Sequence, residues 1–242
     1  GLHHVGVQAI ISDNGIIPPS TMDLVLQLDA GVGVWDPNRP GVPLVDGERV
    51  GLWEDQSAGG LLDAKAKWGD PILKTDGDFP VIRFDGSSGM VIYDLTEPND
   101  QATFLDPEDP NDRGLLGLNT LTVYVVGKLN DEALTSRIFF ANYGDGKGYG
   151  LGVSDTIPDY VKFWTNTGGN MQSGGPIEDT SRYYLLAGVV TQTYGKKLII
   201  NDCIEKEGLG GTVISTNSVV SIGALAGGNQ FLVGDIAEIR VY

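Results

Sequence analysis

The sequence predicts an all-β protein, folded as a two-sheet antiparallel jelly-roll sandwich. Three observations carry this prediction. No stretch of about ten residues keeps apolar positions at the i, i+3, i+4 and i+7 spacing of an amphipathic helix. Short runs rich in β-branched and aromatic residues recur instead, and Gly, Pro, Asn or Asp bounds each of them. The 35 glycines among 242 residues show no three-residue period, so they suit tight turns and exclude collagen.

The predicted strands follow one another along most of the chain. In the last of them Ala237, Ile239 and Val241 alternate with Glu238 and Arg240, which is the pattern of a half-buried strand. So many short strands in one chain imply two packed sheets. The predicted strands are 24–30, 81–84, 121–128, 137–142, 149–153, 160–165, 183–191, 197–201, 219–223 and 234–242.

Three segments rich in turn-forming residues are expected to be loops, namely 31–49, 94–114 and 166–181. Residues 1–21 are expected to be a lead-in, because Pro18 and Pro19 stiffen the chain as in an interdomain linker. No composition break divides the remainder, so we expect one domain over residues 22–242.

The charge and the apolar runs exclude several classes of partner. The formal net charge of −16 repels phosphate backbones, which makes nucleic acid and anionic membrane surfaces unsuitable partners. No apolar run approaches the roughly 20 residues that cross a bilayer, so no membrane insertion is expected. The first residues also lack the pattern of a signal peptide, and the chain therefore reads as a mature or excised segment.

Several motifs in a fixed order resemble one family, the LamG-like jelly-roll domains of the concanavalin A-like lectin/glucanase superfamily, in their bacterial extracellular form. LVLQLDA at 24–30, LWEDQSAGG at 52–60 and PVIRFDGSSGMVI at 80–92 are similar to its N-terminal pattern. LTVYVVGK at 121–128 is similar to its central strand, with Tyr124 in place of the usual Trp. The segments at 182–208 and 219–242 resemble its long hairpin and its closing strands, with Asp202 in place of the turn glycine.

The resemblance implies an extracellular sandwich, often one module of a secreted or cell-surface protein, that binds a glycan or another surface protein. It also implies that the closing strand at 234–242 pairs with the first strand at 24–30. It does not imply catalysis, because the same fold carries both lectins and hydrolases.

The residues themselves offer little for catalysis. Histidine chemistry has no candidate inside the fold, because His3 and His4 stand at the very start. Paired carboxylates of a glycosidase must share one face of the sheet, whereas Asp235 and Glu238 lie three apart and are expected on opposite faces. A glycoside hydrolase or polysaccharide lyase therefore remains the weakest of the three readings.

Calcium is the one cofactor that the acidic residues suggest. An acidic loop on a rigid sandwich can supply the six to eight oxygens that calcium takes. The alternating acids of a calcium-binding loop are absent, so solvated turns remain the other reading of this segment. A second set, Asp29, Asp55 and Asp85, either binds calcium or accepts hydrogen bonds from turn N–H groups. The candidate ligands of the acidic loop are Asp94, Asp100, Asp106, Asp109 and Asp112.

Aromatic side chains are the candidate sugar platforms. Trp35, Trp68 and Tyr143 stand in segments that resemble loops, where a sugar ring could stack on them. Alternatively, a Trp in such a segment covers the edge of the hydrophobic core. Trp53 and Trp164 are expected inside the core. The lone cysteine, Cys203, is expected to be a small buried hydrophobe.

These observations together predict a non-catalytic recognition module that binds a glycan in a cleft built by loops, with calcium as a candidate for ordering them. The alternative is a structural or adhesive assembly module of a multidomain surface protein. An exposed aromatic cleft would favour the first, and a large apolar patch on a sheet face would favour the second.

Overall fold

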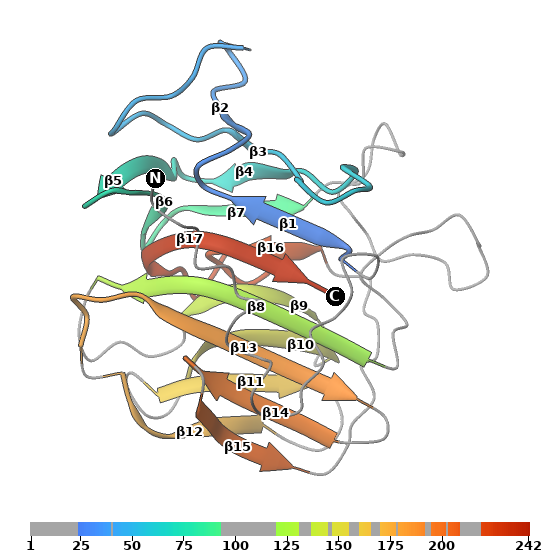
Figure 1. The fold of residues 1–242 in the computed structure, drawn as a ribbon. Helices are drawn as coiled ribbons and strands as arrows, with labels where there is room; N and C mark the ends of the chain where they lie inside the picture. The colour runs from blue at the N-terminus through green and yellow to red at the C-terminus, as the bar shows by residue number, and fades with distance from the viewer. Residues whose placement is uncertain are drawn as a thin grey trace.

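The structure is a computed structural model that describes residues 24–39, 41–92, 120–130, 137–144, 147–154, 160–165, 170–177, 179–191, 195–201, 203–208 and 219–242. These residues contain strands and turns and no helix, so none of them forms a helix that could span a membrane. Two antiparallel sheets lie face to face (Figure 1). The predicted fold class is confirmed. The lead-in at 1–21 and the acidic loop at 94–114 lie outside the described residues.

We call the sheet at the front of Figure 1 sheet A. Its order is β15 (Cys203–Gly208), β14 (Gly195–Ile200), β13 (Tyr184–Thr191), β8 (Thr120–Leu129), β17 (Val233–Val241), β6 (Phe79–Asp85) and β5 (Ile72–Asp76). A further strand, β1 (Leu26–Asp29), pairs with the C-terminal half of β17, with Leu26 opposite Val241 and Asp29 opposite Glu238. The pairing of the first and last strands is therefore confirmed.

Sheet B forms the second layer. Its order is β12 (Asn170–Pro176), β11 (Tyr160–Thr165), β10 (Lys147–Val153), β9 (Ile138–Gly144), β16 (Val220–Ile222), β7 (Gly89–Ile92), β4 (Ala64–Trp68), β3 (Leu52–Trp53) and β2 (Val34–Trp35). The ten predicted strands are all present. The segment 166–181 is different from its prediction, because Asn170–Pro176 forms the edge strand β12. An edge strand tolerates glycine and a terminal proline, since one side of it needs no partner.

One continuous core fills the space between the sheets. Trp53, Phe84, Phe140 and Phe163 are fully buried in it, which confirms the core position predicted for Trp53. The fit is close: a Cβ on Gly188 of β13 would stand 2.2 Å from the ring of Phe163 on the opposite sheet. Glycine is needed at that position because the aromatic ring occupies the space of a side chain.

A β-bulge in β17 changes which side chains face the core. The pairing of β17 with β8 shifts register between Ile236 and Glu238. The inserted residue moves Ala237 out of alternation, so Ile236 joins Ile239 in the core and Ala237 is only half-buried. The predicted inward position of Ala237 is wrong for this reason. A bulge depends on the neighbouring strand, so strict alternation within the segment could not reveal it.

Candidate functional site

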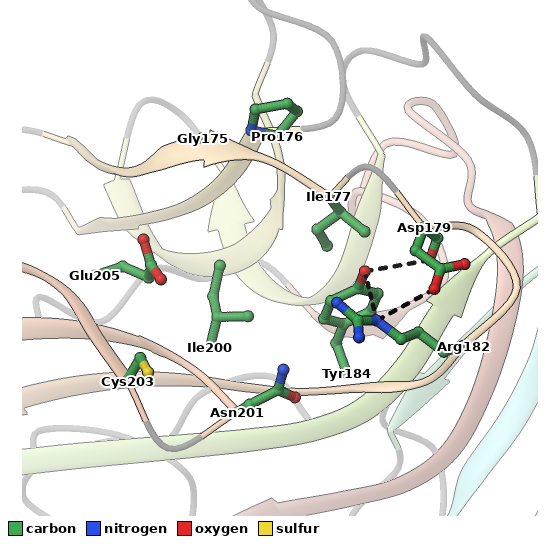
Figure 2. A pocket seen from close by; sticks show the side chains of 10 residues that line it. All are labelled: Gly175, Pro176, Ile177, Asp179, Arg182, Tyr184, Ile200, Asn201, Cys203 and Glu205. Carbon is green, nitrogen blue, oxygen red and sulfur yellow. Dashed lines mark hydrogen bonds and ion pairs between the residues drawn. The ribbon is translucent and has the colours of Figure 1, made fainter.

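A pocket of about 390 Å³ lies at one edge of the sandwich, where the last strands of the two sheets approach each other (Figure 2). One wall comes from sheet B and the segment after β12, the other comes from β14, β15 and the turn between them, and the segment before β13 forms a third side. Its volume lies at the lower end of the roughly 300–1,000 Å³ of ligand sites. The pocket is lined by Gly175, Pro176, Ile177, Asp179, Arg182, Tyr184, Ile200, Asn201, Cys203 and Glu205.

Arg182 is held in place by two neighbours. Its guanidinium carbon lies 5.0 Å from the centre of the Tyr184 ring, and its Nε donates to the Tyr184 hydroxyl at 3.1 Å. The same Nε lies 3.5 Å from Asp179 Oδ2, and the Tyr184 hydroxyl donates to the Asp179 carbonyl at 3.2 Å. These contacts use Nε, so the two terminal nitrogens of Arg182 make no hydrogen bond to the residues that the structure describes. They are donors available to a ligand.

Hydrogen bonds keep both Asp179 and Arg182 in their charged forms. The side-chain and backbone hydrogen bonds from Ser181 lower the pKa of Asp179 below its ordinary value. The hydrogen bond to the Tyr184 hydroxyl raises the pKa of Arg182. Asp179 is thus an anion and Arg182 a cation at neutral pH. Glu205 lies on the opposite wall of the pocket (Figure 2).

Asn201 supplies an amide at the turn between β14 and β15. Its φ of +54° is left-handed, which Asn tolerates better than most residues. Its Oδ1 accepts from the Leu185 N–H at 3.2 Å, and its own N–H donates to the Leu185 carbonyl at 2.7 Å. The acceptor is therefore used, while the amide nitrogen points into the space that the lining residues enclose (Figure 2).

The prediction that Cys203 is buried is wrong. Cys203 is exposed on the edge strand β15 and lines the pocket, and is not a buried hydrophobe. All residues of β15 except the half-buried Glu205 are exposed, which the apolar neighbours Ile199 and Ile200 did not suggest.

The three predicted sugar platforms lie elsewhere. Trp35, Trp68 and Tyr143 belong to strands β2, β4 and β9, so their assignment to loops is wrong. The register places all three on the outer face of sheet B, but on separate strands. Tyr143 packs edge-on against Trp164, with ring centres 6.2 Å apart. Trp164 is buried, which confirms its predicted core position, and it belongs to this smaller cluster rather than to the main core.

The carboxylates of Asp29, Asp55 and Asp85 accept hydrogen bonds from backbone N–H groups in turns. Asp29 Oδ1 accepts from the Gly31 N–H at 2.8 Å, and Asp85 Oδ1 accepts from the Ser87 N–H at 2.9 Å. Asp55 accepts from the N–H groups of Gln27 at 3.0 Å and Ser57 at 2.9 Å, which joins its turn to β1. Within the described part of the chain no three acidic, Cys or His residues are grouped so that they could hold a metal ion. The candidates of the acidic loop, Asp94, Asp100, Asp106, Asp109 and Asp112, lie outside that part.

A charged cluster occupies the outer face of sheet A. Asp235 is fully buried and accepts two hydrogen bonds from Arg83, at 2.7 and 2.8 Å, and one from Asn130 at 2.8 Å. Asp76 accepts from Lys128 and, at 2.9 Å, from the Tyr183 hydroxyl. Each cation of the cluster therefore has a carboxylate partner within it.

This cluster lacks the features of an acid–base site. Burial, followed by the hydrogen bond to Asp76, raises the pKa of Tyr183 above its ordinary value, so the hydroxyl stays protonated. The bulge also places Glu238 on the same face as Asp235, which corrects the expectation of opposite faces. Glu238 is held by Arg240, and both carboxylates are thus already neutralised. The cluster links β5, β6, β8, β17 and Tyr183, the residue before β13.

The sandwich and its edge pocket define the class of this protein: an antiparallel two-sheet β-sandwich domain. No family model matches the sequence, and no curated protein matches it either. Solved structures do match the fold. Domain 4 of AbnA, a GH43 extracellular arabinanase from Geobacillus stearothermophilus solved with arabinotriose, is 16% identical at a TM-score of 0.58, covering 91% of this chain and 92% of that one.

Two toxin domains match similarly. The binding domain of botulinum neurotoxin DC, solved with rat synaptotagmin II, is 8% identical at a TM-score of 0.57. Botulinum neurotoxin type C, whose cell entry depends on interaction with two ganglioside molecules, is 10% identical at 0.56. Each match covers 92% of this chain and 48% of the toxin chain, so the chain spans about half the length of these toxin structures. Identities this low establish the shared fold alone.

Proposed function

We propose that this chain is a non-catalytic carbohydrate-recognition module, LamG-like in type, that binds a neutral glycan in the edge pocket. The observation that carries the proposal is the lining of that pocket. The terminal nitrogens of Arg182 and the amide of Asn201 are donors, Asp179 and Glu205 are acceptors, and Ile177 adds an apolar surface. Neighbouring hydroxyls of a sugar both donate and accept, and its C–H face is apolar, so the ring matches this lining.

The charge of the site selects against acidic sugars. Asp179 lines the pocket as an anion, and the chain as a whole carries a net charge of −16. A uronate or sulfate group would meet repulsion as it approaches the protein. Arabinotriose, the sugar bound to the arabinanase domain, supports a neutral glycan as the ligand. The extracellular setting of the arabinanase supports a secreted or surface location.

The assembly alternative has less support. The exposed large hydrophobic side chains of the described residues are Val32, Val42, Val45, Phe79 and Ile204. The three valines lie outside the strands, Phe79 is the first residue of β6, and Ile204 lies on the edge strand β15. Single exposed apolar residues are normal on a soluble protein.

The pocket proposal predicts which substitutions weaken binding. Arg182→Ala and Asn201→Gly are each expected to reduce affinity for a neutral oligosaccharide about tenfold, because each removes a donor to a hydroxyl. Glycine suits the left-handed turn, so Asn201→Gly keeps the backbone. An array of neutral and acidic glycans, followed by calorimetry with the best binder, provides the measurement.

The matched control for this prediction is Arg49→Ala. Arg49 pairs with Asp70 at the surface, away from the pocket, and its loss should leave affinity unchanged. The proposal is wrong if the array shows no neutral glycan bound, or if both pocket variants bind as tightly as the wild type.

We further propose that calcium binds the acidic loop at 94–114. Millimolar calcium added after chelation is then expected to raise the melting temperature, because a ligand of the folded state stabilises it. Magnesium should act less, since its strict octahedral geometry suits an irregular loop poorly. The joint variant Asp106→Asn/Asp109→Asn should lose the calcium shift. An unchanged melting temperature in the wild type would leave these acids as solvated surface.

A further inference from the structure

The turn between β16 and β17 folds over Trp68. Gly228 is left-handed, at a φ of +69°, and its backbone lies so close to the indole that a Cβ there would stand 2.6 Å from Trp68 Nε1. Phe231 meets the same indole edge-on, with ring centres 6.2 Å apart. Arg137 holds this end of the turn by donating to the Phe231 carbonyl at 2.9 Å. Trp68 is thus fixed in orientation while it remains partly exposed.

Gln230 has an unexpected backbone conformation in this turn. Its φ is +53°. Among the described residues other than glycine, only Asn201 also has a positive φ. Asn is enriched at such positions, whereas Gln has no comparable local hydrogen bond to offer. Eleven described glycines occupy positive-φ positions in the same chain. A glycine at 230 would form the turn at lower cost, so the turn itself does not account for the Gln side chain.

Hydrogen bonds fix the turn in this shape. The Leu225 N–H donates to the Asn229 carbonyl at 2.9 Å, and the Gly228 N–H donates to the Leu225 carbonyl at 2.8 Å. Asn229 and Gln230 follow directly after the residue that touches the indole, and both are exposed. Two exposed residues with amide side chains therefore lie one and two positions after the glycine that touches an oriented aromatic ring. A ring and amides together can hold a sugar, since the ring takes the C–H face and the amides take the hydroxyls.

We propose that Trp68, Asn229 and Gln230 form a second carbohydrate-binding surface, here called the Trp68 ledge, for a neutral sugar. The ligand class rests on the proposed function, but the ledge shares no residue with the edge pocket. Six strand spacings separate β12 from β4 in sheet B, which is roughly 30 Å across the sheet. A trisaccharide cannot span this separation, whereas a polysaccharide can occupy both sites and gain avidity.

Titrations of the isotope-labelled chain with arabinotriose, cellotriose and maltotriose, followed by NMR, test this proposal. The Trp68 indole N–H and the Gln230 side-chain amide report on the ledge, and the backbone amides of Asn201 and Cys203 report on the pocket. In the wild type both sets are expected to shift and saturate with at least one sugar, each with its own affinity. Gln230→Gly should weaken the ledge about two- to tenfold. It should also raise the melting temperature by about 2–4 °C, because the strain is relieved.

The variants separate the two sites. If the Gln230→Gly variant melts at a higher temperature than the wild type, unfolding cannot explain a loss of binding. Trp68→Ala should abolish the response of the ledge signals while the pocket signals still shift. Arg182→Ala should do the reverse. Ledge signals that stay unmoved with all three sugars, or a Gln230→Gly variant with full ledge affinity, overturn the ledge. Pocket signals that stay unmoved while the ledge responds overturn the pocket instead.

Discussion

Deleting residues 235–242 is expected to leave no soluble folded monomer. The deletion removes most of β17, which pairs with β8 along one edge and with β6 and β1 along the other. Sheet A would therefore be divided in its middle, and each new edge would expose unpaired N–H and C=O groups. Ile236, Ile239 and Val241 are fully buried, and each contributes about 1.5–3 kcal/mol. Their sum is comparable with the roughly 5–15 kcal/mol of net stability of a typical domain.

Size-exclusion chromatography and thermal melting measure this effect. Deleting residues 1–19 is the control, because this segment is expected from its sequence to be a lead-in before the domain, and it should change the melting temperature little. Point variants give a graded version: Ile239→Ala should lower the free energy of unfolding by about 2–5 kcal/mol. Glu238→Ala, which removes only a side chain of the outer face, should cost about 1 kcal/mol or less. A monomeric 235–242 deletion with unchanged melting would show that β17 is peripheral.

The sequence predicted the parts of this fold that local pattern determines. Segments such as 121–128 and 160–165 have enough β-branched and aromatic residues, bounded by turn formers, to predict a strand by themselves. The strands that were not predicted are β2, β3, β4, β5, β7, β12 and β15. Among them β2 and β3 are only two residues long and β12 is rich in Gly, Ser and Pro, so these three depend on pairing with a neighbour. Pairing between strands is a property of the whole sheet, and the sequence of so short a segment does not show it.

The edge pocket could not be predicted because its residues are far apart in the chain. Pro176 is the last residue of β12, Arg182 precedes β13, and Glu205 lies on β15, so the site exists only where the edges of two sheets meet. The one local signal was Asn201, which stands at the turn of the long hairpin where a left-handed residue is required. The aromatic residues predicted to bind sugar all lie on sheet B instead. Of these, Trp68 carries the proposed ledge, and the reason is the neighbouring turn at 225–230, which the sequence did not single out.

Replacing Asp235 with Asn is expected to lower the free energy of unfolding by about 3 kcal/mol. The substitution keeps the shape of the side chain and removes its charge, so Arg83 and Lys128 lose the buried carboxylate between them. Breaking a buried pair costs about 3–5 kcal/mol, and the lower end applies because 36% of the Arg83 side chain is exposed. For a domain of this size the melting temperature should fall by about 6–12 °C.

An exposed ion pair gives the matched control. Asp70→Asn breaks the contact with Arg49, where both side chains are more than half exposed, and should cost less than about 1 kcal/mol. Thermal and denaturant melting of the two variants, side by side, compares loss of a buried charge with loss of a surface charge. Glycan affinity at a temperature where both stay folded should be unchanged, because neither residue lines the pocket. Equal melting of the two variants would mean that the Arg83–Asp235 pair adds no more stability than a surface contact. In that case the cohesion of sheet A would rest on the packing of β17 and its backbone hydrogen bonds alone.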